Sequence, residues 1–321
     1  MGKLVAIKPR LDEVRRIMAE NATWSPRDFI PGISRAEDRA IRAESLTRGL
    51  RAEDDLRFFY ESRRHGPLAL LAERLAWDSD FFGLGVARLN AVFPLEAPFV
   101  RLDAVWNKPL EKLLKQAQRR GVRYLFAMVD PRDTALLRSL GELGFALIET
   151  RYYHHGPLTE PPEGERFPVR EARPEDVPSL ARTAAEQVNP YDRFHADPFM
   201  QGEDTGRLMR RWIEESIAGR MADLVLVPDV EEPTAFVTYR FEKANWARWG
   251  VNLAQGVLSA VSADFLGWMG KLTPELNRAL LAAGANYTFG STQVTNRPII
   301  HFAQEAGARF GRCEHILRVL L

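Results

Sequence analysis

The sequence has a single cysteine among 321 residues, and this scarcity excludes several kinds of site. Cys313 alone forms neither an intrachain disulfide nor a metal site that needs several cysteines. So little use of cysteine is typical of a reducing compartment. The start, MGKLVAIKPRLDEV, lacks the long apolar core and the cleavage signature of a signal peptide. We therefore expect a cytoplasmic protein.

Long hydrophobic runs and an excess of one charge are also missing. No stretch approaches the roughly 20 apolar residues that a membrane span requires. The formal net charge is +1, which gives no electrostatic footprint for a nucleic acid or an anionic membrane. We expect neither among the partners. With 45% hydrophobic and 27% charged residues, the chain has enough apolar material for two globular cores.

What the sequence does contain is an internal repeat at a fixed offset of 163 residues. Residues 124–145 align with residues 287–308, and the same offset brings residues 7–19 onto residues 170–182. Several aligned segments in one register are hard to ascribe to chance. We therefore expect two copies of one α/β unit, each of roughly 160 residues, which is a normal domain length.

Each copy shows the same expected order of elements. A strand and a helix with an acidic start are followed by two hairpin strands, a strand leading into a helix, and a final strand, helix and strand. Each copy is therefore expected to be a mixed-sheet α/β domain, at 1–156 and 169–321, with a Pro-, Gly- and Glu-rich linker at 157–168. In the second copy, Thr273 and Pro274 are expected to cap and begin the helix after the fourth strand.

The order β-α-β-β-β-α-β-α-β, with a C-terminal TQxxN run and a later glycine, resembles the GNAT fold of acyl-CoA-dependent N-acyltransferases. The run is formed by Thr292, Gln293, Asn296 and Gly307. Four segments narrow the resemblance to dTDP-fucosamine acetyltransferases and their relatives: WDSDFFG (77–83), LGFALIET (143–150), DRFHADP (192–198) and MRRWIEESIAG (209–219). In that family a GNAT domain follows a shortened GNAT-like domain. The resemblance covers roughly residues 70–321 and implies transfer of an acetyl group from acetyl-CoA to the amine of a nucleotide-linked amino sugar.

The resemblance also implies that acetyl-CoA, or another acyl-CoA, is held between the fourth strand and the next helix. The family carries R/QxxGxG/A there, whereas this chain has Leu266 in the Arg position and Met269 and Lys271 in place of the required glycines. The loop keeps two glycines and a lysine before a helix, which suits an anion; a plain turn that binds nothing is the alternative. The residues expected to contact the cofactor are Ser259, Val261, Gly267, Trp268, Met269, Gly270, Lys271 and Asn296.

The tyrosine that the family places seven residues after the Asn is absent, because Ala303 stands there. His301 is a candidate general acid, since imidazole titrates near neutral pH, but it lies about 200° round the helix from Ala303. Alternatively, His301 is an ordinary surface histidine. Water or the intrinsic acidity of the thiol would then suffice to protonate the leaving thiolate. General acid help is usually worth only about 10²–10⁴-fold.

By the same resemblance, the DRFHADP segment lies near the acceptor. Arg193 is expected to grip a phosphate or carboxylate with its planar guanidinium. His195 and Asp197 are expected to bind sugar hydroxyls or take the proton of the ammonium group. A capping loop, in which Asp197 before Pro198 starts a helix, is an equal alternative. The segment has too few spaced ligands for a metal, and we expect none.

The leading interpretation is an acyl-CoA-dependent N-acetyltransferase whose second copy acylates a small-molecule amine. The first copy has Asp133 where Asn296 stands and AVWNKPLEK (104–112) in place of the loop, so we expect a degenerate scaffolding copy. A catalytically inactive GNAT pair that serves as a binding or interaction module is the alternative, because fold does not fix function. A third reading keeps the transfer but takes a longer acyl chain, which Leu266 and Trp268 would suit. A homodimer is left open.

Overall fold

The chain divides into two compact units that do not strictly follow the sequence. The computed structural model describes residues 2–7, 11–21, 25–48, 56–61, 67–95, 106–159, 166–200 and 203–321. Unit 1 comprises Met1–Thr150 together with Cys313–Leu321, and unit 2 comprises Arg151–Arg312. The last residues of the second copy thus complete unit 1. Half of the expected linker 157–168 lies outside the described residues, since 160–165 are not described.

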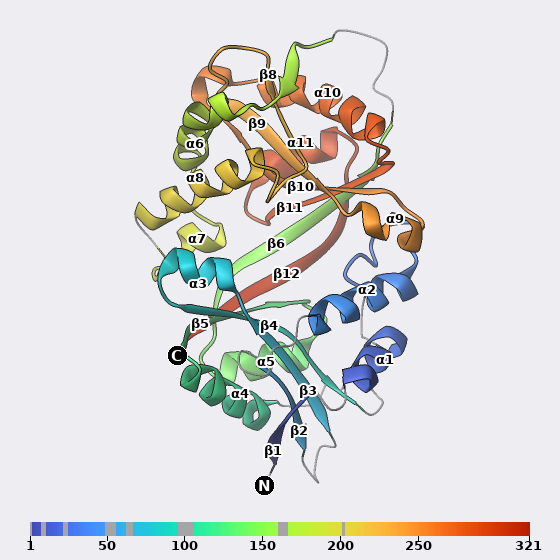
Figure 1. The fold of residues 1–321 in the computed structure, drawn as a ribbon, viewed down its shortest axis with the longest axis vertical. Helices are drawn as coiled ribbons and strands as arrows, with labels where there is room; N and C mark the ends of the chain where they lie inside the picture. Colours follow the sequence, from blue (N-terminus) through green and yellow to red (C-terminus); the bar gives the residue numbers. More distant parts are fainter. Residues whose placement is uncertain are drawn as a thin grey trace. The chain divides into compact units, whose positions relative to one another are not determined.

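Unit 1 has a mixed sheet with helices on both faces (Figure 1). In spatial order its strands are β1 (Lys3–Ala6), β2 (Leu56–Glu61), β3 (Leu68–Arg74), β4 (Gly85–Pro94), β5 (Val122–Val129) and β12 (Arg309–Leu320). Neighbouring strands run antiparallel except β4 and β5, which are parallel. The helices are α1 (Leu11–Asn21), α2 (Arg35–Thr47), α3 (Ala76–Phe82), α4 (Asn107–Arg119) and α5 (Thr134–Glu142).

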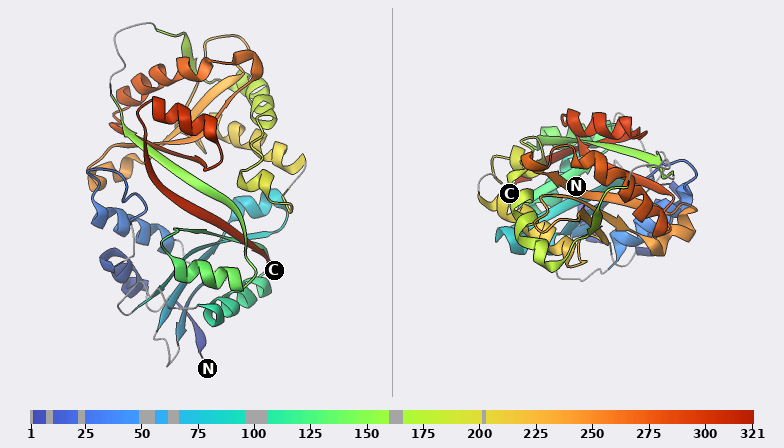
Figure 2. Two further views of the ribbon diagram at one scale, coloured as in Figure 1. Left: turned by 180° about the vertical axis from the view of Figure 1, so that it is seen from behind. Right: turned by 90° about the horizontal axis from the view of Figure 1, so that it is seen from above.

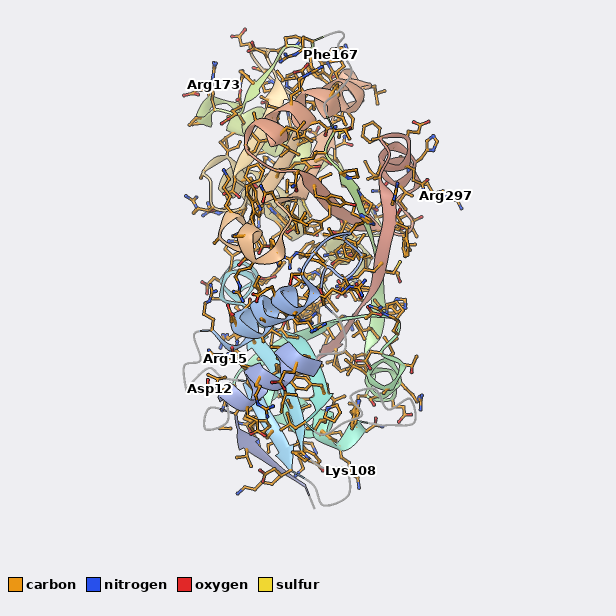
Figure 3. All side chains as sticks on the ribbon, turned by 90° about the vertical axis from the view of Figure 1, so that its right-hand side faces the viewer. Asp12, Arg15, Lys108, Phe167, Arg173 and Arg297 are labelled. Atoms are coloured by element: carbon orange, nitrogen blue, oxygen red, sulfur yellow. The ribbon has the colours of Figure 1, made fainter. Side chains whose placement is uncertain are left out.

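Strand alternation gives unit 1 two apolar layers. Phe58 and Leu70 pack with α4 and α5, whereas Phe59 and Leu71, the next residues along each strand, pack with α1 and α2. Successive side chains of a strand point to opposite faces, so almost wholly apolar strands are needed when both faces are covered. The outer face of α1 is polar and carries Asp12 and Arg15, 3.4 Å apart (Figure 3).

Unit 2 repeats the arrangement. In spatial order its strands are β7 (Val169–Glu171), β8 (Leu224–Pro228), β9 (Ala235–Phe241), β10 (Leu253–Val261), β11 (Tyr287–Gln293) and β6 (Ala146–Pro157). Only β10 and β11 are parallel. The helices are α6 (Val177–Glu186), α7 (Arg193–Ala196), α8 (Glu203–Ile217), α9 (Lys243–Trp249), α10 (Trp268–Ala282) and α11 (Arg297–Glu305), with 3₁₀ turns η2 (Pro174–Asp176) and η3 (Ala263–Phe265). Figure 2, from behind, shows α11 in front of these strands.

The two units share strand register as well as element order. Tyr124 of β5 lies opposite Val86 of β4, and Tyr287 of β11, which the sequence repeat aligns with Tyr124, lies opposite Leu253 of β10. The register of β4 and that of β10 each shift at a bulge, four residues beyond these partners. The expected pair of mixed-sheet units with an internal repeat is therefore confirmed. Among the described residues, no helix is both long and apolar enough to cross a bilayer.

The start of α10 corrects one expectation. The helix begins at Trp268, so Pro274 lies inside it and Thr273 is not its cap. The Thr273 hydroxyl donates instead to the Met269 carbonyl, at 2.8 Å. Pro274 removes one helical N–H, but Leu272 and Leu276 on either side of it are buried in the core. Burial of this apolar stripe outweighs the local proline signal.

A close backbone contact in unit 1 gives a stability prediction. A Cβ on Gly85 would lie 2.1 Å from the Gly121 carbonyl oxygen, which belongs to the backbone and cannot turn away. We expect Gly85→Ala to lower the free energy of unfolding by about 1–3 kcal/mol in urea titrations. Gly141→Ala is the control, because nothing lies within 4 Å of its Cβ position in α5. That change should stabilise by roughly 0.5–1 kcal/mol; equal stability of the two variants would contradict the contact.

Candidate active site

In unit 2 the parallel strands β10 and β11 diverge before either strand ends. β10 and β11 pair only from Leu253–Gln255 with Tyr287–Phe289, although both strands continue beyond this point. We call the diverging stretches, Gly256–Val261 and Gly290–Gln293, the fork. A bulge at Val257 interrupts the register of β10 with β9 where the fork opens. The bulge bends β10 locally, as bulges do.

The β10 edge of the fork carries backbone groups that no strand pairs. The Ser262 N–H donates to the Thr234 carbonyl at 2.9 Å, toward β9. Because alternate residues of an antiparallel strand direct their N–H and C=O groups to opposite edges, those of Ser259 and Val261 face the fork. At the bulge itself, the Thr238 hydroxyl satisfies both the N–H and the C=O of Leu258, at 2.9 and 3.0 Å. The fork edge thus offers two donors and two acceptors at strand spacing.

The fork edge leads through η3 to the first turn of α10. Gly267, with φ of 89°, precedes this turn, and no side chain caps it. Only Gly can enter this left-handed conformation without strain. The Lys271 ammonium lies 5.0 Å from the centre of the Trp268 ring. Six of the expected cofactor residues after Ser259 therefore follow one continuous path from strand to helix, and Leu266, at 81% exposure, projects from its turn.

Asn296, the remaining expected cofactor residue, lies between β11 and α11 and directly precedes the helix. Its side-chain amide donates to the Thr292 hydroxyl at 2.9 Å and makes no cap on α11. The Gln293 side chain, next along, accepts a hydrogen bond from the Asn189 amide in the loop before α7. These contacts join the end of β11 to the segment that carries the expected acceptor residues.

Two carboxylates order the segment that carries the residues expected to contact the acceptor. Asp192 accepts the N–H groups of Phe194 and His195 and also contacts His195 Nδ1 at 2.7 Å. A carboxylate oxygen accepts hydrogen bonds, so Nδ1 is the donor in this contact, and Nε2 is the ring nitrogen that Asp192 does not contact. Asp197 is fully buried and accepts the Phe199 N–H at 3.0 Å. Asp197 thus caps a turn; the next helix, α8, starts at Glu203 and not at Pro198.

Arg193 and His301 have different surroundings. The Arg193 guanidinium lies 4.3 Å from the centre of the Phe194 ring, which orients its planar group. His301 lies on the exposed side of α11, where its Nε2 is 3.3 Å from a carboxylate oxygen of Glu305. Ala303, on the same helix, is buried. Imidazole and methyl therefore lie on different sides of α11.

Two ring side chains that are not among the site residues expected from the sequence lie at the opening of the fork. Tyr239 of β9 pairs with Gly256, and His154 of β6 pairs with Gly290. A Cβ on Gly256 would lie 3.4 Å from the Tyr239 phenol oxygen, and one on Gly290 would lie 2.9 Å from His154 Nε2. Each ring covers a glycine. Glycine inside a strand often marks such a close approach, and this was the available sequence signal.

Burial shifts the acidity of both rings. It raises the pKa of the Tyr239 phenol above its usual value, and the nearby Thr288 hydroxyl opposes part of this effect. Burial, and to a lesser degree the neighbouring His155, lowers the pKa of His154. Desolvation disfavours the charged form in each case. At neutral pH the phenol therefore keeps its proton and the imidazole is uncharged.

The equivalent positions of unit 1 form a closed apolar core. In the shared register, Ala72 and Leu89 stand where unit 2 has Tyr239 and Gly256, and Ala127 and Leu317 stand where it has Gly290 and His154. All four unit-1 side chains are buried in one cluster. In addition, Arg42 of α2 donates to the carbonyl of the bulge residue Asn90, at 3.3 Å.

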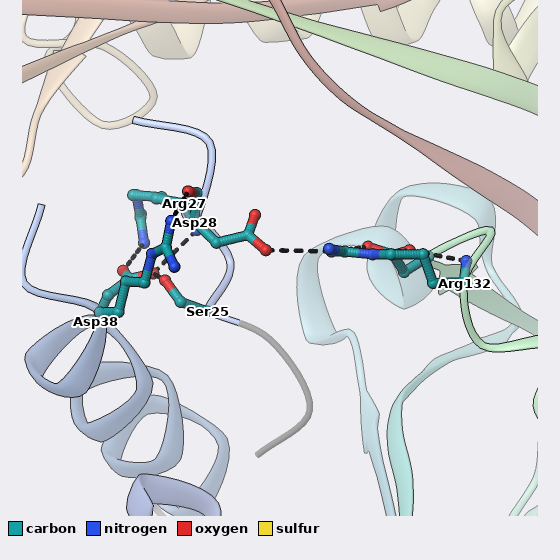
Figure 4. A network of polar contacts seen from close by, with 7 residues as sticks. Ser25, Arg27, Asp28, Asp38 and Arg132 are labelled. Atoms are coloured by element: carbon teal, nitrogen blue, oxygen red, sulfur yellow. Dashed lines mark hydrogen bonds and ion pairs between the residues drawn. The ribbon is translucent and has the colours of Figure 1, made fainter. Parts of the chain in front are cut away.

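Unit 1 also ties the loop after its first long helix to the end of its central strand. Asp28 pairs with Arg132 at 3.2 Å, beside the contacts among Ser25, Arg27 and Asp38 (Figure 4). The corresponding tie in unit 2 joins two neutral amides. Asp133 caps α5 by accepting the Leu136 N–H, at 3.1 Å. Residues 104–105 of the expected replacement loop lie outside the described residues.

Comparison with known proteins supports the duplicated fold. No model of a known protein family matches the chain, and no curated protein sequence matches it. A tandem GNAT protein from the clavulanic acid biosynthesis pathway is similar in structure, at 12% identity and a TM-score of 0.59, covering 100% of this chain and 98% of that one. The chain has a tandem GNAT fold.

Two further solved structures resemble it. A GCN5-related N-acetyltransferase from Sphaerobacter thermophilus has 14% identity and a TM-score of 0.57, with 100% of this chain and 95% of that one covered. A glucosamine N-acetyltransferase region of a fungal multi-domain β-N-acetylglucosaminidase has 10% identity and a TM-score of 0.62, with 99% of this chain and 38% of that one covered. At such identities the likeness concerns the fold alone.

The buried position of Ala303 gives a prediction about the missing tyrosine. Because only 8% of Ala303 is exposed, we expect Ala303→Tyr to overpack its surroundings and to lower stability by about 1–3 kcal/mol in thermal unfolding. Gln304→Tyr, at an exposed position of the same helix, should unfold like the unchanged protein. An Ala303→Tyr variant of unchanged stability would mean that the site has room for a phenol there.

Proposed function

We propose that unit 2 is an acyl-CoA-dependent N-acetyltransferase that acts on a small-molecule amine. The observation that carries the proposal is the fork, whose β10 edge leaves the N–H and C=O groups of Ser259 and Val261 without a strand partner. An extended chain containing amides satisfies such an edge as an added strand does. The pantetheine arm of CoA is a chain of this kind.

The fork edge runs from the bulge in β10 to the first turn of α10, and this course supports one orientation of the bound acyl-CoA. Phosphates belong at the first turn of α10, where uncapped N–H groups and Lys271 favour an anion. The arm then follows Val261 and Ser259 back toward the bulge, which brings the thioester to the opening of the fork.

Unit 1 is proposed as a scaffold that binds no donor. Leu89 and Leu317 fill the place of its fork, and Arg42 already occupies the bulge carbonyl. A ligand would have to displace packed side chains there, which costs several kcal/mol of buried contacts. At the equivalent positions of unit 2, β10 and β11 have the glycines Gly256 and Gly290 and are not paired with each other.

For the acceptor, we propose an amino sugar, with a nucleotide-linked one as the narrower form. The resemblance of DRFHADP to the acceptor segment of dTDP-fucosamine acetyltransferases supports the narrower form, and a glucosamine N-acetyltransferase region among the similar structures supports the broader. Arg193 suits the phosphate of such a substrate. The second candidate function is a binding module without catalysis, favoured by Leu266 in the place of the usual Arg.

The fork edge can be tested by removing one N–H group. Ser259→Pro deletes a donor that we propose contacts the pantetheine arm, whereas Ser259→Ala keeps it. In calorimetry on the full chain we expect Ser259→Pro to weaken CoA binding by about tenfold or more and Ser259→Ala to leave it unchanged. Failure of the unchanged protein to bind CoA would reject the proposed function. Unchanged binding by Ser259→Pro would reject the fork edge as the contact.

Arg193 gives a separate test on the acceptor side. With acetyl-CoA as donor and a panel of amines that includes glucosamine and nucleotide-linked amino sugars, Arg193→Ala should raise the acceptor KM by about tenfold or more, through loss of a charged contact. CoA affinity should stay the same. Arg210→Ala, at an exposed position of α8, is the matched control. A loss of CoA affinity in Arg193→Ala would reassign the segment to the donor.

A further inference from the structure

The two glycines at the opening of the fork lie at one level. Ala254 lies opposite Thr288 and Gln255 opposite Phe289, so Gly256 and Gly290 would form the next opposed positions if pairing continued. The strands are about 4.8 Å apart where they are paired, and farther apart beyond. At these two positions neither strand has a side chain of its own on the face that Tyr239 and His154 cover.

We propose that Tyr239 donates, and His154 accepts, the protons that move during acyl transfer. This inference rests on the function proposed above. Both rings are half-buried beside the fork opening, where the path of the donor ends. Among the described residues no hydrogen bond occupies the ring nitrogens of His154, whose ring contact is with Tyr152. The pair supplies the acid that Ala303 cannot.

Unit 1 provides an internal comparison for this assignment. The register that puts a phenol, two glycines and an imidazole round the fork of unit 2 puts Ala72, Leu89, Ala127 and Leu317 in unit 1. A position that only had to fill a sheet would serve with apolar residues, as it does there. Unit 2 has two titratable rings round two glycines at these positions, although one of the rings, Tyr239, also packs against the apolar core of the unit.

The proposed transfers move one proton from the amine to His154 and one from Tyr239 to the thiolate. The amine nitrogen forms a bond to the thioester carbonyl carbon, and its proton passes to Nε2 of uncharged His154. When the carbon–sulfur bond breaks, sulfur keeps the electron pair and takes the phenol proton of Tyr239. The imidazolium proton then returns to the phenolate through solvent. The net change is amine and thioester to amide and thiol, with both side chains restored.

The environments of the two rings match these roles. A carboxyl or amino group that titrated in the working range would disturb either ring by its charge. After burial, the neighbouring His155 is the second cause of the lowered pKa of His154, and burial lowers the pKa of His155 as well. His155 is also held by the Tyr287 hydroxyl, at 2.9 Å. For Tyr239, the polar neighbour is the uncharged Thr288 hydroxyl.

The role of Tyr239 can be tested in the absence of an amine acceptor. In a complex of the full chain with CoA, a phenol that donates to sulfur stabilises the thiolate. Tyr239→Phe should therefore raise the pKa of the bound CoA thiol by about one to two units, measured from thiolate absorbance. Tyr153→Phe, on the opposite face of β6 from His154, should leave it unchanged. CoA binding with no shift in Tyr239→Phe would overturn the inference and leave the proposed function standing.

The role of His154 is tested with acetyl-CoA and glucosamine. His154→Gln should lower kcat by about 10²–10⁴-fold, and added imidazole should restore part of the rate, which it would not do for a ring needed only for packing. His315→Gln, in unit 1, should keep the normal rate. A His154→Gln enzyme of normal rate, or a loss that imidazole does not repair at unchanged thermal stability, would overturn the assignment. No transfer by the unchanged protein would overturn the proposed function with it.

Discussion

The early end of pairing between β10 and β11 is the constraint from which the properties of unit 2 follow. Backbone N–H and C=O groups are strong hydrogen-bonding groups, and a strand that loses its neighbour must satisfy them elsewhere. The Thr238 hydroxyl satisfies one residue at the bulge, and the edge beyond it faces the fork. The same departure removes the need for side chains at Gly256 and Gly290, so rings from the flanking strands reach the opening. Strand geometry thus supplies both the binding edge and the room for chemistry.

Duplication shows how little separates a site from a core in this fold. Units 1 and 2 share strand order, the parallel pair, the bulge and the register. They differ at four positions at the opening of the fork, where unit 1 has two alanines and two leucines and unit 2 has two glycines and two rings. Apolar burial closes unit 1 and stabilises it, whereas unit 2 gives up that burial to keep polar rings beside an open edge. The tie between loop and strand differs in the same sense, with an ion pair in unit 1 and two neutral amides in unit 2.

Sequence patterns within short segments predicted the structural features that depend on neighbouring residues. The repeat, the element order and the path from Ser259 to Lys271 rest on periodicity and on glycines within a short stretch. The expectation that α10 starts at Thr273 and Pro274 was wrong, because tertiary burial of Leu272 and Leu276 overrides the proline signal. His154 and Gly290 are far apart in sequence and meet only through antiparallel pairing, so a single sequence gives no register from which to infer their contact. Asp197 is of a residue type common in binding sites, and neither its complete burial nor its hydrogen bond from the Phe199 N–H can be read from the sequence.

The exchange of the last strand makes the two units one folding problem. β12 pairs with β5 through His315–Leu320, so the sheet of unit 1 stays one strand short until the whole of unit 2 has been synthesised. Until then β5 presents an unpaired edge, which is a template for pairing with another chain. Closing so long a loop is slow, because its entropy is lost before the contacts form. During synthesis of the duplicated chain, unit 1 therefore remains incomplete, with the edge of β5 exposed, until unit 2 has been made.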